Sequence, residues 1–181
     1  MYMVRAFFAV DLTHSIRNQF YAAQDILRNS DAKLTCVDPP LAHITLKFLG
    51  DVSDDVMHCV QEIMSEFSFK PTEITVSGVR LHPKNRPRIV WADVSDNGWG
   101  EVTVAELDRR LAPLGIASET RLFTPHVTLG HIKRYDRSLR AAVEEVSGYS
   151  FGRMSVDTIT LKKSTLTPQG PVYEDIMEMK A

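Results

Sequence analysis

A short motif that occurs twice in the chain combines residue types that can move protons and hold a phosphate. It reads His-Ile-Thr-Leu from His43 to Leu46 and His-Val-Thr-Leu from His126 to Leu129. Histidine has an ordinary pKa of about 6.5, so near neutral pH one imidazole can be neutral while a second is charged. A neutral ring can take a proton from water and a protonated ring can give one to a leaving oxygen, each for a rate gain of roughly 10²–10⁴-fold.

Each motif also carries a threonine two positions after its histidine, at Thr45 and Thr128. Side chains alternate faces along a strand, so the histidine and threonine of one motif point the same way. The hydroxyls can donate hydrogen bonds to the non-bridging oxygens of a phosphate as negative charge builds there. Two such surfaces facing each other would have the groups needed to hydrolyse a cyclic phosphodiester without a metal.

Other interpretations of the two motifs remain open on the residues alone. A duplication could have copied a structural strand in which both histidines are simply hydrogen-bonded. His43 and His126 could instead bind zinc with a carboxylate, although no carboxylate stands at a facing position inside either motif. His82 lies beside a turn, and the pattern assigns it no role. Trp91 lies in a predicted strand and is expected to pack in the hydrophobic core.

The elements that must position the motifs follow from the apolar periodicity. Both motifs lie in apolar, β-branched runs, 42–49 and 125–132, which predict strands. Apolar residues spaced three and four apart predict four helices, with Thr13, Ser53 and Asp136 as candidate caps of three of them. The third helix is expected at about 98–114, further strands at 3–10, 73–82, 88–94, 154–166 and 171–179, and a connector at 33–40.

The order of these elements repeats along the chain. His43 and His126 are 83 positions apart (126 − 43), and Phe8-Ala9 and Trp91-Ala92 show the same offset. We therefore expect an internal duplication with repeat units of roughly 3–83 and 87–168, followed by a closing strand at 171–179. The predicted fold is α+β, with two pseudo-symmetric lobes, each a largely antiparallel sheet backed by two helices. We expect a central groove between the lobes and a single compact domain over residues 1–181.

Composition narrows the classes of partner. The formal net charge is −2, so no global positive field attracts nucleic acid, and any RNA contact must be local. Cys36 and Cys59 lack a Cys-x-x-Cys spacing and are expected to be free thiols in a reducing cytosol. No run approaches the ~18 apolar residues of a membrane span, and the apolar run at 6–10 is too short for a signal peptide. We expect a cytoplasmic monomer that contacts no membrane.

Beyond the motifs, longer stretches of the chain resemble a known family. Residues 42–52 and 123–130 resemble the two signatures of the RNA 2′,3′-cyclic phosphodiesterases, also called 2′-5′ RNA ligases. This family belongs to the two-histidine (2H) phosphoesterase superfamily. Residues 5–11, 86–92 and 170–174 are also similar to that family, so the resemblance runs from the first predicted strand to the last.

The resemblance implies metal-independent hydrolysis, without a cofactor, of RNA ends that bear a 2′,3′-cyclic phosphate, giving 2′-phosphates. It implies that His43 is the proton donor to the leaving 3′ oxygen and that His126 is the proton acceptor that activates water. It also implies reversible, ATP-independent joining of RNA, such as tRNA halves, through a 2′-5′ bond. The alternative from a different class is a non-catalytic module that binds RNA ends or phosphate.

Four further residues are candidates for substrate binding. Lys47 shares its parity with the first motif's histidine and threonine, so it is expected on the groove face, although a solvated lysine is an equal alternative. Arg5 and Arg121 are weaker candidates for phosphate contacts. Phe123 could stack on a base, but a place in the core is the stronger expectation.

His131 is the fifth candidate, because many members of the family carry an arginine at its position. A histidine there is a weaker and pH-dependent partner for an anion. Strict alternation turns His131 away from His126, so its role requires a bulge in the strand. Many members of the family also carry an aromatic residue near the position of Cys36, and this chain has none there.

Overall fold

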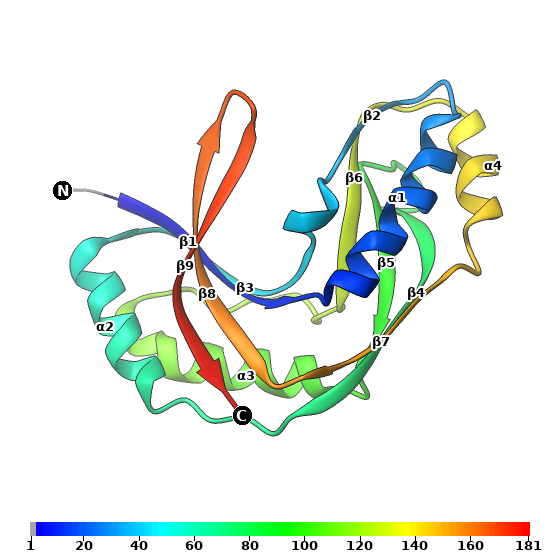
Figure 1. The fold of residues 1–181 in the computed structure, drawn as a ribbon. Helices are drawn as coiled ribbons and strands as arrows, with labels where there is room; N and C mark the ends of the chain where they lie inside the picture. The colour runs from blue at the N-terminus through cyan, green and yellow to red at the C-terminus, as the bar shows by residue number, and fades with distance from the viewer. Residues whose placement is uncertain (1–2) are drawn as a thin grey trace.

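The computed structural model describes residues 3–181 as two lobes that share one antiparallel sheet (Figure 1). The strand order is β7-β4-β5-β6-β3-β1-β8-β9, with β2 paired to β6. The strands are β1 (Met3–Asp11), β2 (Lys33–Cys36), β3 (His43–Ser53), β4 (Thr72–His82), β5 (Ile89–Ser95), β6 (His126–Arg134), β7 (Ser150–Val156), β8 (Thr158–Thr167) and β9 (Gly170–Lys180). The helices are α1 (His14–Arg28), α2 (Asp54–Ser65), α3 (Trp99–Leu111) and α4 (Ser138–Glu145).

Each lobe is a half of the sheet covered by two helices. The first lobe holds β3, β1, β8 and β9, with α2 and α3 packed on it. The second holds β7, β4, β5, β6 and β2, and α1 and α4 pack on that half. Helix α1 follows β1 in the chain yet packs on the second lobe, and α3 follows β5 yet packs on the first. The α+β class with two lobes, each backed by two helices, is therefore confirmed.

Helices α1 and α2 begin where the sequence indicated. The Thr13 hydroxyl accepts a hydrogen bond from the Ile16 amide at 3.5 Å, and the Ser53 hydroxyl accepts one from the Val56 amide at 3.3 Å. These contacts satisfy amides that have no partner inside the first helical turn. The chain thus leaves strands β1 and β3 at defined points.

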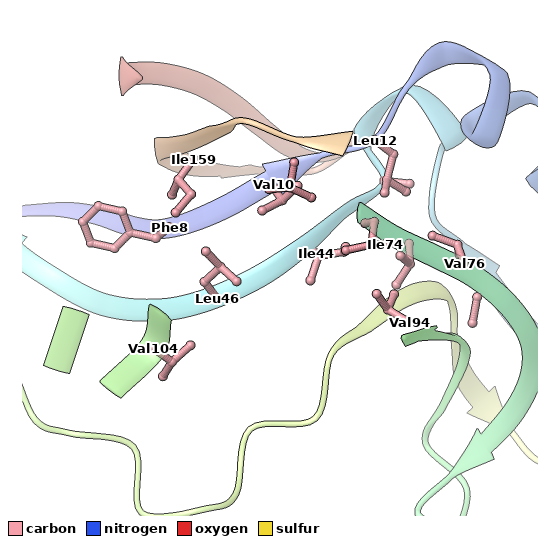
Figure 2. Close-up of a cluster of buried hydrophobic side chains, with 14 of the residues drawn as sticks. Phe8, Val10, Leu12, Ile44, Leu46, Ile74, Val76, Val94, Val104 and Ile159 are labelled. Atoms are coloured by element: carbon pink, nitrogen blue, oxygen red, sulfur yellow. The ribbon is translucent and has the colours of Figure 1, made fainter. Parts of the chain in front are cut away.

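A continuous core fills the space between the sheet and the helices and runs through the junction of the lobes (Figure 2). Val10 of β1 and Ile44 of β3 gather there with side chains of β4 and β5. Ile44 and Val127, the residues between histidine and threonine in the two motifs, are both buried. Because neighbours along a strand point to opposite faces, the motif histidines and threonines lie on the other side of the sheet.

The structure corrects several expected elements. Residues 33–36, expected in a connector, form β2 at the edge of β6, a strand too short to show an alternating pattern. The strand expected at 154–166 is divided at Asp157 into β7 and β8. Helix α3 ends at Leu111, and residues 112–114 form a 3₁₀ turn. Helix α4 begins at Ser138, whose amide donates to the Asp136 carboxylate at 2.9 Å.

The internal duplication into units 3–83 and 87–168 stays a prediction, but strand pairing adds a detail to it. Asp11 lies opposite His43 on β1 and β3, and Asp93 lies opposite His126 on β5 and β6. The two aspartates are 82 positions apart (93 − 11), one fewer than the 83 that separate the histidines. The first strands of the two units therefore correspond at an offset of 82, and the sequence match of Phe8-Ala9 with Trp91-Ala92 at 83 is one residue out of register.

Candidate active site

The two motif strands meet at the centre of the sheet. Ile44 of β3 lies opposite Val127 of β6 in antiparallel pairing. Because paired strands run in opposite directions, each histidine comes beside the threonine of the other motif. In a regular ladder the two histidines would form a diagonal pair about 7–8 Å apart. The pairing thus gathers two imidazoles and two hydroxyls on one face of the junction.

A cavity of about 400 Å³ lies between the lobes on this face. Residues of β8, β9 and β6 are among its lining, and Figure 1 shows the β8–β9 hairpin separated from β6 at the junction of the lobes. The side chains that line it include His43, Thr45, His126, Thr128, Arg5, Phe7, Phe48, His131, Leu166 and Tyr173. The cavity therefore brings together all four motif residues, together with Arg5 and His131 of the further candidates.

A β-bulge interrupts β3 at Leu46, directly after the first His-x-Thr. Ala9 pairs with Thr45, whereas the preceding Phe8 pairs with Lys47, so Leu46 is the extra residue. A bulge shifts the alternation of faces by one residue. Lys47 therefore turns away from the cavity, and the residue after it takes the place on the groove face.

The expectation that Lys47 lies on the groove face is thus corrected by the bulge. Its side chain is buried in the first lobe, where Nζ donates to the carbonyl oxygen of Ala117 at 2.8 Å and pairs with the carboxylate of Asp108. Phe48 lines the cavity instead and is 65% exposed. An exposed aromatic ring at the rim of a cavity can stack on a nucleobase.

A second β-bulge lies at the matching place in β6. Trp91 pairs with Thr128, whereas the preceding Val90 pairs with Gly130, so Leu129 is the extra residue. The shift turns His131 to the same face as the motif histidine, and His131 lines the cavity. The bulge on which a role for His131 depended is present.

The other two candidates lie outside this cavity. Phe123 packs against the core beside Gly100, so closely that a methyl group on the glycine would lie 2.3 Å from the Phe123 ring. Arg121 is exposed in the segment between α3 and β6 and is absent from the lining of the cavity. The segment before β6 follows the helical side of the first lobe, which carries both residues away from the groove.

Both motif histidines are held in the same way. Nδ1 of His43 is 2.8 Å from the carbonyl oxygen of Leu41, and Nδ1 of His126 is 2.8 Å from that of Thr124. A carbonyl oxygen can only accept, so Nδ1 carries the proton and Nε2 of the neutral ring is the acceptor. Each ring is thus oriented with Nε2 as the nitrogen that can exchange a proton with a ligand.

Burial lowers the pKa of both histidines below the ordinary 6.5, and the hydrogen bond to the backbone carbonyl acts in the opposite direction. Both rings are therefore mainly neutral at pH 7 in the free protein. This form suits a proton acceptor directly. A proton donor would need its charged form to be stabilised by the bound anion.

Comparison with known proteins identifies the family. The family described as LigT like phosphoesterase matches residues 10–91 and 101–173. The chain belongs to this family. It is 34% identical over 178 residues to a protein of Methanothermobacter thermautotrophicus named RNA 2′,3′-cyclic phosphodiesterase, with 96% of each chain covered. A protein of Archaeoglobus fulgidus with the same name is 35% identical, with 96% of this chain and 98% of that protein covered.

Solved structures share the fold of this chain. The crystal structure of TT0787 from Thermus thermophilus superposes with a TM-score of 0.79 at 25% identity and covers 97% of both chains. E. coli LigT, solved in complex with 3′-AMP, gives a TM-score of 0.82 at 22% identity, with 99% of this chain and 98% of that chain covered. The arrangement of two lobes around a groove is therefore that of the family.

In this LigT-like phosphoesterase, different aromatic groups flank the two histidines. The His43 ring lies 5.0 Å from the ring of Phe7 and 5.3 Å from that of Tyr173, edge-on to the latter. The His126 ring packs on Trp91 at 4.3 Å, and His82 stacks on Trp91 at 4.0 Å. Sequence reasoning assigned no role to His82, because its contact with Trp91 comes from the pairing of β4 with β5.

An aspartate lies across the strand from each histidine, and sequence reasoning missed both. Asp11, opposite His43, binds Arg17 at 2.9 Å and the buried Lys162 at 2.8 Å, and Lys162 also binds Asp175 at 2.6 Å. The negative charge of Asp11 raises the pKa of His43, against the larger effect of burial. The only signal for this role is the recurrence of an aspartate near the end of the strand before each motif.

The second aspartate has a different set of partners. Asp93, opposite His126, pairs with Arg80 and accepts a hydrogen bond from Trp91 Nε1 at 3.2 Å. Its charge raises the pKa of His126, whereas the neighbouring His82 lowers it. The carboxylate therefore fixes the Trp91 ring that packs on the imidazole.

Three further features concern residues 3–181 as a whole. No group of three or more His, Cys, Asp or Glu side chains in that range is arranged to hold a metal ion. No helix in it is long and apolar enough to cross a membrane. Cys36 and Cys59 are free thiols, as expected.

Proposed function

We propose that this protein hydrolyses 2′,3′-cyclic phosphates at RNA ends to 2′-phosphates. The observation that carries the proposal is one cavity lined by two His-x-Thr pairs, each with its imidazole anchored through Nδ1. The names of the archaeal relatives support the choice of substrate, because identity of 34–35% extends over nearly the whole chain. In-line attack at phosphorus requires a base beside the entering oxygen and an acid beside the leaving oxygen, and two imidazoles that line one cavity can take these two places.

In the proposed reaction Nε2 of His126 takes a proton from water, and the water oxygen bonds to phosphorus. The bond between phosphorus and the 3′ oxygen breaks, and His43 gives its proton to that oxygen. The product is a 2′-phosphate with a free 3′ hydroxyl. The hydroxyls of Thr45 and Thr128 donate to the non-bridging oxygens as their charge grows. The direction, with His43 as donor, follows the family resemblance.

The bound phosphodiester itself prepares the donor. Burial keeps His43 mainly neutral in the free protein. An anion held against the ring favours its charged form. Binding of the substrate therefore raises the pKa of His43, and the ring takes up from solvent the proton that it later gives to the leaving oxygen.

Two further residues are proposed to bind the substrate phosphate. Arg5 lines the cavity, and its planar guanidinium can bind a phosphate through two parallel hydrogen bonds. His131 also lines it, but burial, and to a smaller extent Lys133, lower its pKa. At neutral pH His131 is therefore mainly an uncharged hydrogen-bond donor rather than a cation.

The same groups can also join RNA ends by the same displacement. A ribose hydroxyl in the place of water would attack the cyclic phosphate and join two RNA strands, such as tRNA halves, through a 2′-5′ bond. The cyclic ester supplies the leaving group, so the proposal includes no ATP, and the two histidines move the protons without a metal. The cytoplasmic location and the monomeric state stay expectations from the sequence.

The deciding experiment incubates the protein with nucleoside and oligonucleotide 2′,3′-cyclic phosphates in excess chelator and identifies the monoester formed. The expected product is the 2′-phosphate, at the same rate as without chelator. A 3′-phosphate would contradict the assigned geometry. Tight binding without turnover would favour the non-catalytic module, and a loss of activity restored by zinc would favour a metal site.

A further inference from the structure

A second cavity, of about 570 Å³, lies on the second lobe beside β4 and α4. Its lining includes Arg80, His82, Lys84, Trp91 and Arg140, which we call the β4–α4 track. Three of these side chains are cations, of which Arg80 pairs with Asp93, and Glu144 is the carboxylate among the lining residues. In a chain of net charge −2 this is a local concentration of positive charge.

Trp91, which lines the β4–α4 track, packs on His126, which lines the catalytic cavity, so the two cavities adjoin across this pair of rings. One side of the Trp91 ring packs on His126, and His82 stacks on it at 4.0 Å with an angle of 18° between the rings. Arg80 lies opposite Trp91 in the pairing of β4 with β5, so it is on the same face of the sheet. His82 is exposed, so its ring is accessible to a ligand.

We propose that the β4–α4 track binds single-stranded RNA next to the reacting phosphate. Proteins that hold single strands combine cations that follow the backbone with flat rings on which bases stack. Here Arg80, Lys84 and Arg140 supply the cations, and the exposed ring of His82 supplies the stacking surface. The proposal rests on the proposed function, because an RNA end in the cavity must continue across the surface of one lobe.

The strand on the track can have two origins with the same chemistry. It can be the strand that ends in the cyclic phosphate, folded back over the second lobe. It can also be a second strand, whose hydroxyl replaces water at His126 in the joining reaction. The position of the track on the side of His126, the proposed acceptor of the nucleophile's proton, suits the second origin, and kinetics separates the two.

The test compares two double variants that each remove two positive charges. Lys84→Ala with Arg140→Ala alters the track without touching His126. Arg109→Ala with Lys180→Ala is the matched control, on exposed side chains of α3 and β9 outside both cavities. The probe is a labelled RNA of about ten nucleotides with free 5′ and 3′ hydroxyls, a length within the usual range for single-strand sites.

We expect the track variant to raise the Kd of this RNA about tenfold at low salt. The slope of log Kd against log salt should fall by about 1.4, which is ~0.7 for each RNA phosphate that the variant no longer neutralises. The control variant should match the unaltered protein in both measurements. Equal binding by the track and control variants would overturn the proposal.

Kinetics then identifies the bound strand. If it is the strand with the cyclic end, the track variant raises KM for a cyclic-phosphate oligonucleotide and leaves KM for a cyclic mononucleotide unchanged. If it is a second strand, both KM values stay unchanged, and joining to a 5′-hydroxyl RNA decreases. Failure of the unaltered protein to hydrolyse the mononucleotide would refute the proposed function. The binding measurements would still show whether the β4–α4 track binds RNA.

Discussion

The two motif strands share a backbone design but differ in the side chains that it presents. Both carry a bulge at the motif leucine, which brings Phe48 to the groove in the first lobe and His131 in the second. The residue that precedes Phe48 or His131 in its strand lies on the opposite face of the sheet. Lys47 there forms a buried ion pair, whereas Gly130 lies against β2, where a Cβ would come within 3.3 Å of the Thr35 carbonyl oxygen. The geometry is thus repeated, and the chemistry around it is divided between the lobes.

The environments of the two histidines differ in the same way. His43 adjoins the ion pairs of the buried Lys162 with Asp11 and Asp175, whereas His126 adjoins the stacked rings of Trp91 and His82 in the β4–α4 track. Burial lowers the pKa of both histidines, so neither environment alone decides which is the acid. The position of the bound anion and of the leaving oxygen decides it, and this is what variants can test.

The largest effect is expected from removing either histidine. His43→Ala and His126→Ala should each lower kcat by about 10²–10⁴-fold, because each removes one proton transfer. The circular dichroism spectrum should be unchanged. Full activity in either variant would contradict a two-histidine mechanism.

A phosphodiester with a p-nitrophenolate leaving group sharpens this comparison, because that group leaves without a proton. His43→Ala should then recover most of its activity on this ester, and His126→Ala should not. Equal losses on it would contradict the assigned direction, and recovery by His126→Ala alone would reverse it.

The threonines should have the next largest effect. Thr45→Val and Thr128→Val each remove one donor to the phosphate but keep a β-branched side chain that suits a strand. Loss of one such donor lowers kcat by about 10²-fold in comparable sites. Rate measurements at saturating substrate, with KM little changed, would support this role. Unchanged kcat in both variants would assign the threonines to the strand alone.

A third comparison concerns stability. Lys47→Met leaves the Asp108 carboxylate without its cation inside the first lobe and should lower the free energy of unfolding by about 3 kcal/mol. Urea denaturation measures this loss. The KM for a cyclic mononucleotide should stay the same, because the bulge at Leu46 holds Lys47 away from the cavity. A raised KM with unchanged stability would return Lys47 to the substrate site.

The sequence predicted the meeting of the motifs, because alternation and repetition act at the scale of whole strands. It misplaced Lys47 and left His131 undecided, since an apolar residue such as Leu46 or Leu129 fits a regular strand as well as a bulge. Cross-strand neighbours were also beyond its reach. The contact of Asp11 with the first motif depends on the register between β1 and β3, which is a property of the packed sheet.

A smaller effect is expected from the two residues that the bulges present. Phe48→Ala should raise KM for an oligonucleotide about tenfold, because stacking on one base contributes about 1–3 kcal/mol. His131→Ala should raise it only a few-fold at neutral pH, since the lowered pKa of His131 leaves it without full charge. Histidine changes its charge between about pH 5 and 8. If both variants raised KM equally across this range, the assignment of base stacking to Phe48 and of pH-dependent phosphate binding to His131 would be contradicted.

The smallest effect is expected in the pH dependence of the free energy of unfolding, to which both histidines contribute. The unfolded chain binds protons on histidine with a pKa of about 6.5. The folded protein binds them on His43 and His126 only at lower pH, so unfolding takes up protons, and stability decreases as the pH falls below about 6.5. Each pKa unit of difference corresponds to about 1.4 kcal/mol.

Urea denaturation between about pH 5 and 7, the range in which these groups titrate, should show this decrease, and His43→Asn and His126→Asn should each reduce it. The variant that flattens the profile more identifies the ring whose charge the free protein tolerates less. Without substrate that ring is protonated in a smaller fraction of molecules, and it depends more on the phosphate anion to gain its second proton. A profile independent of pH in the unaltered protein would show that neither lobe shifts its histidine.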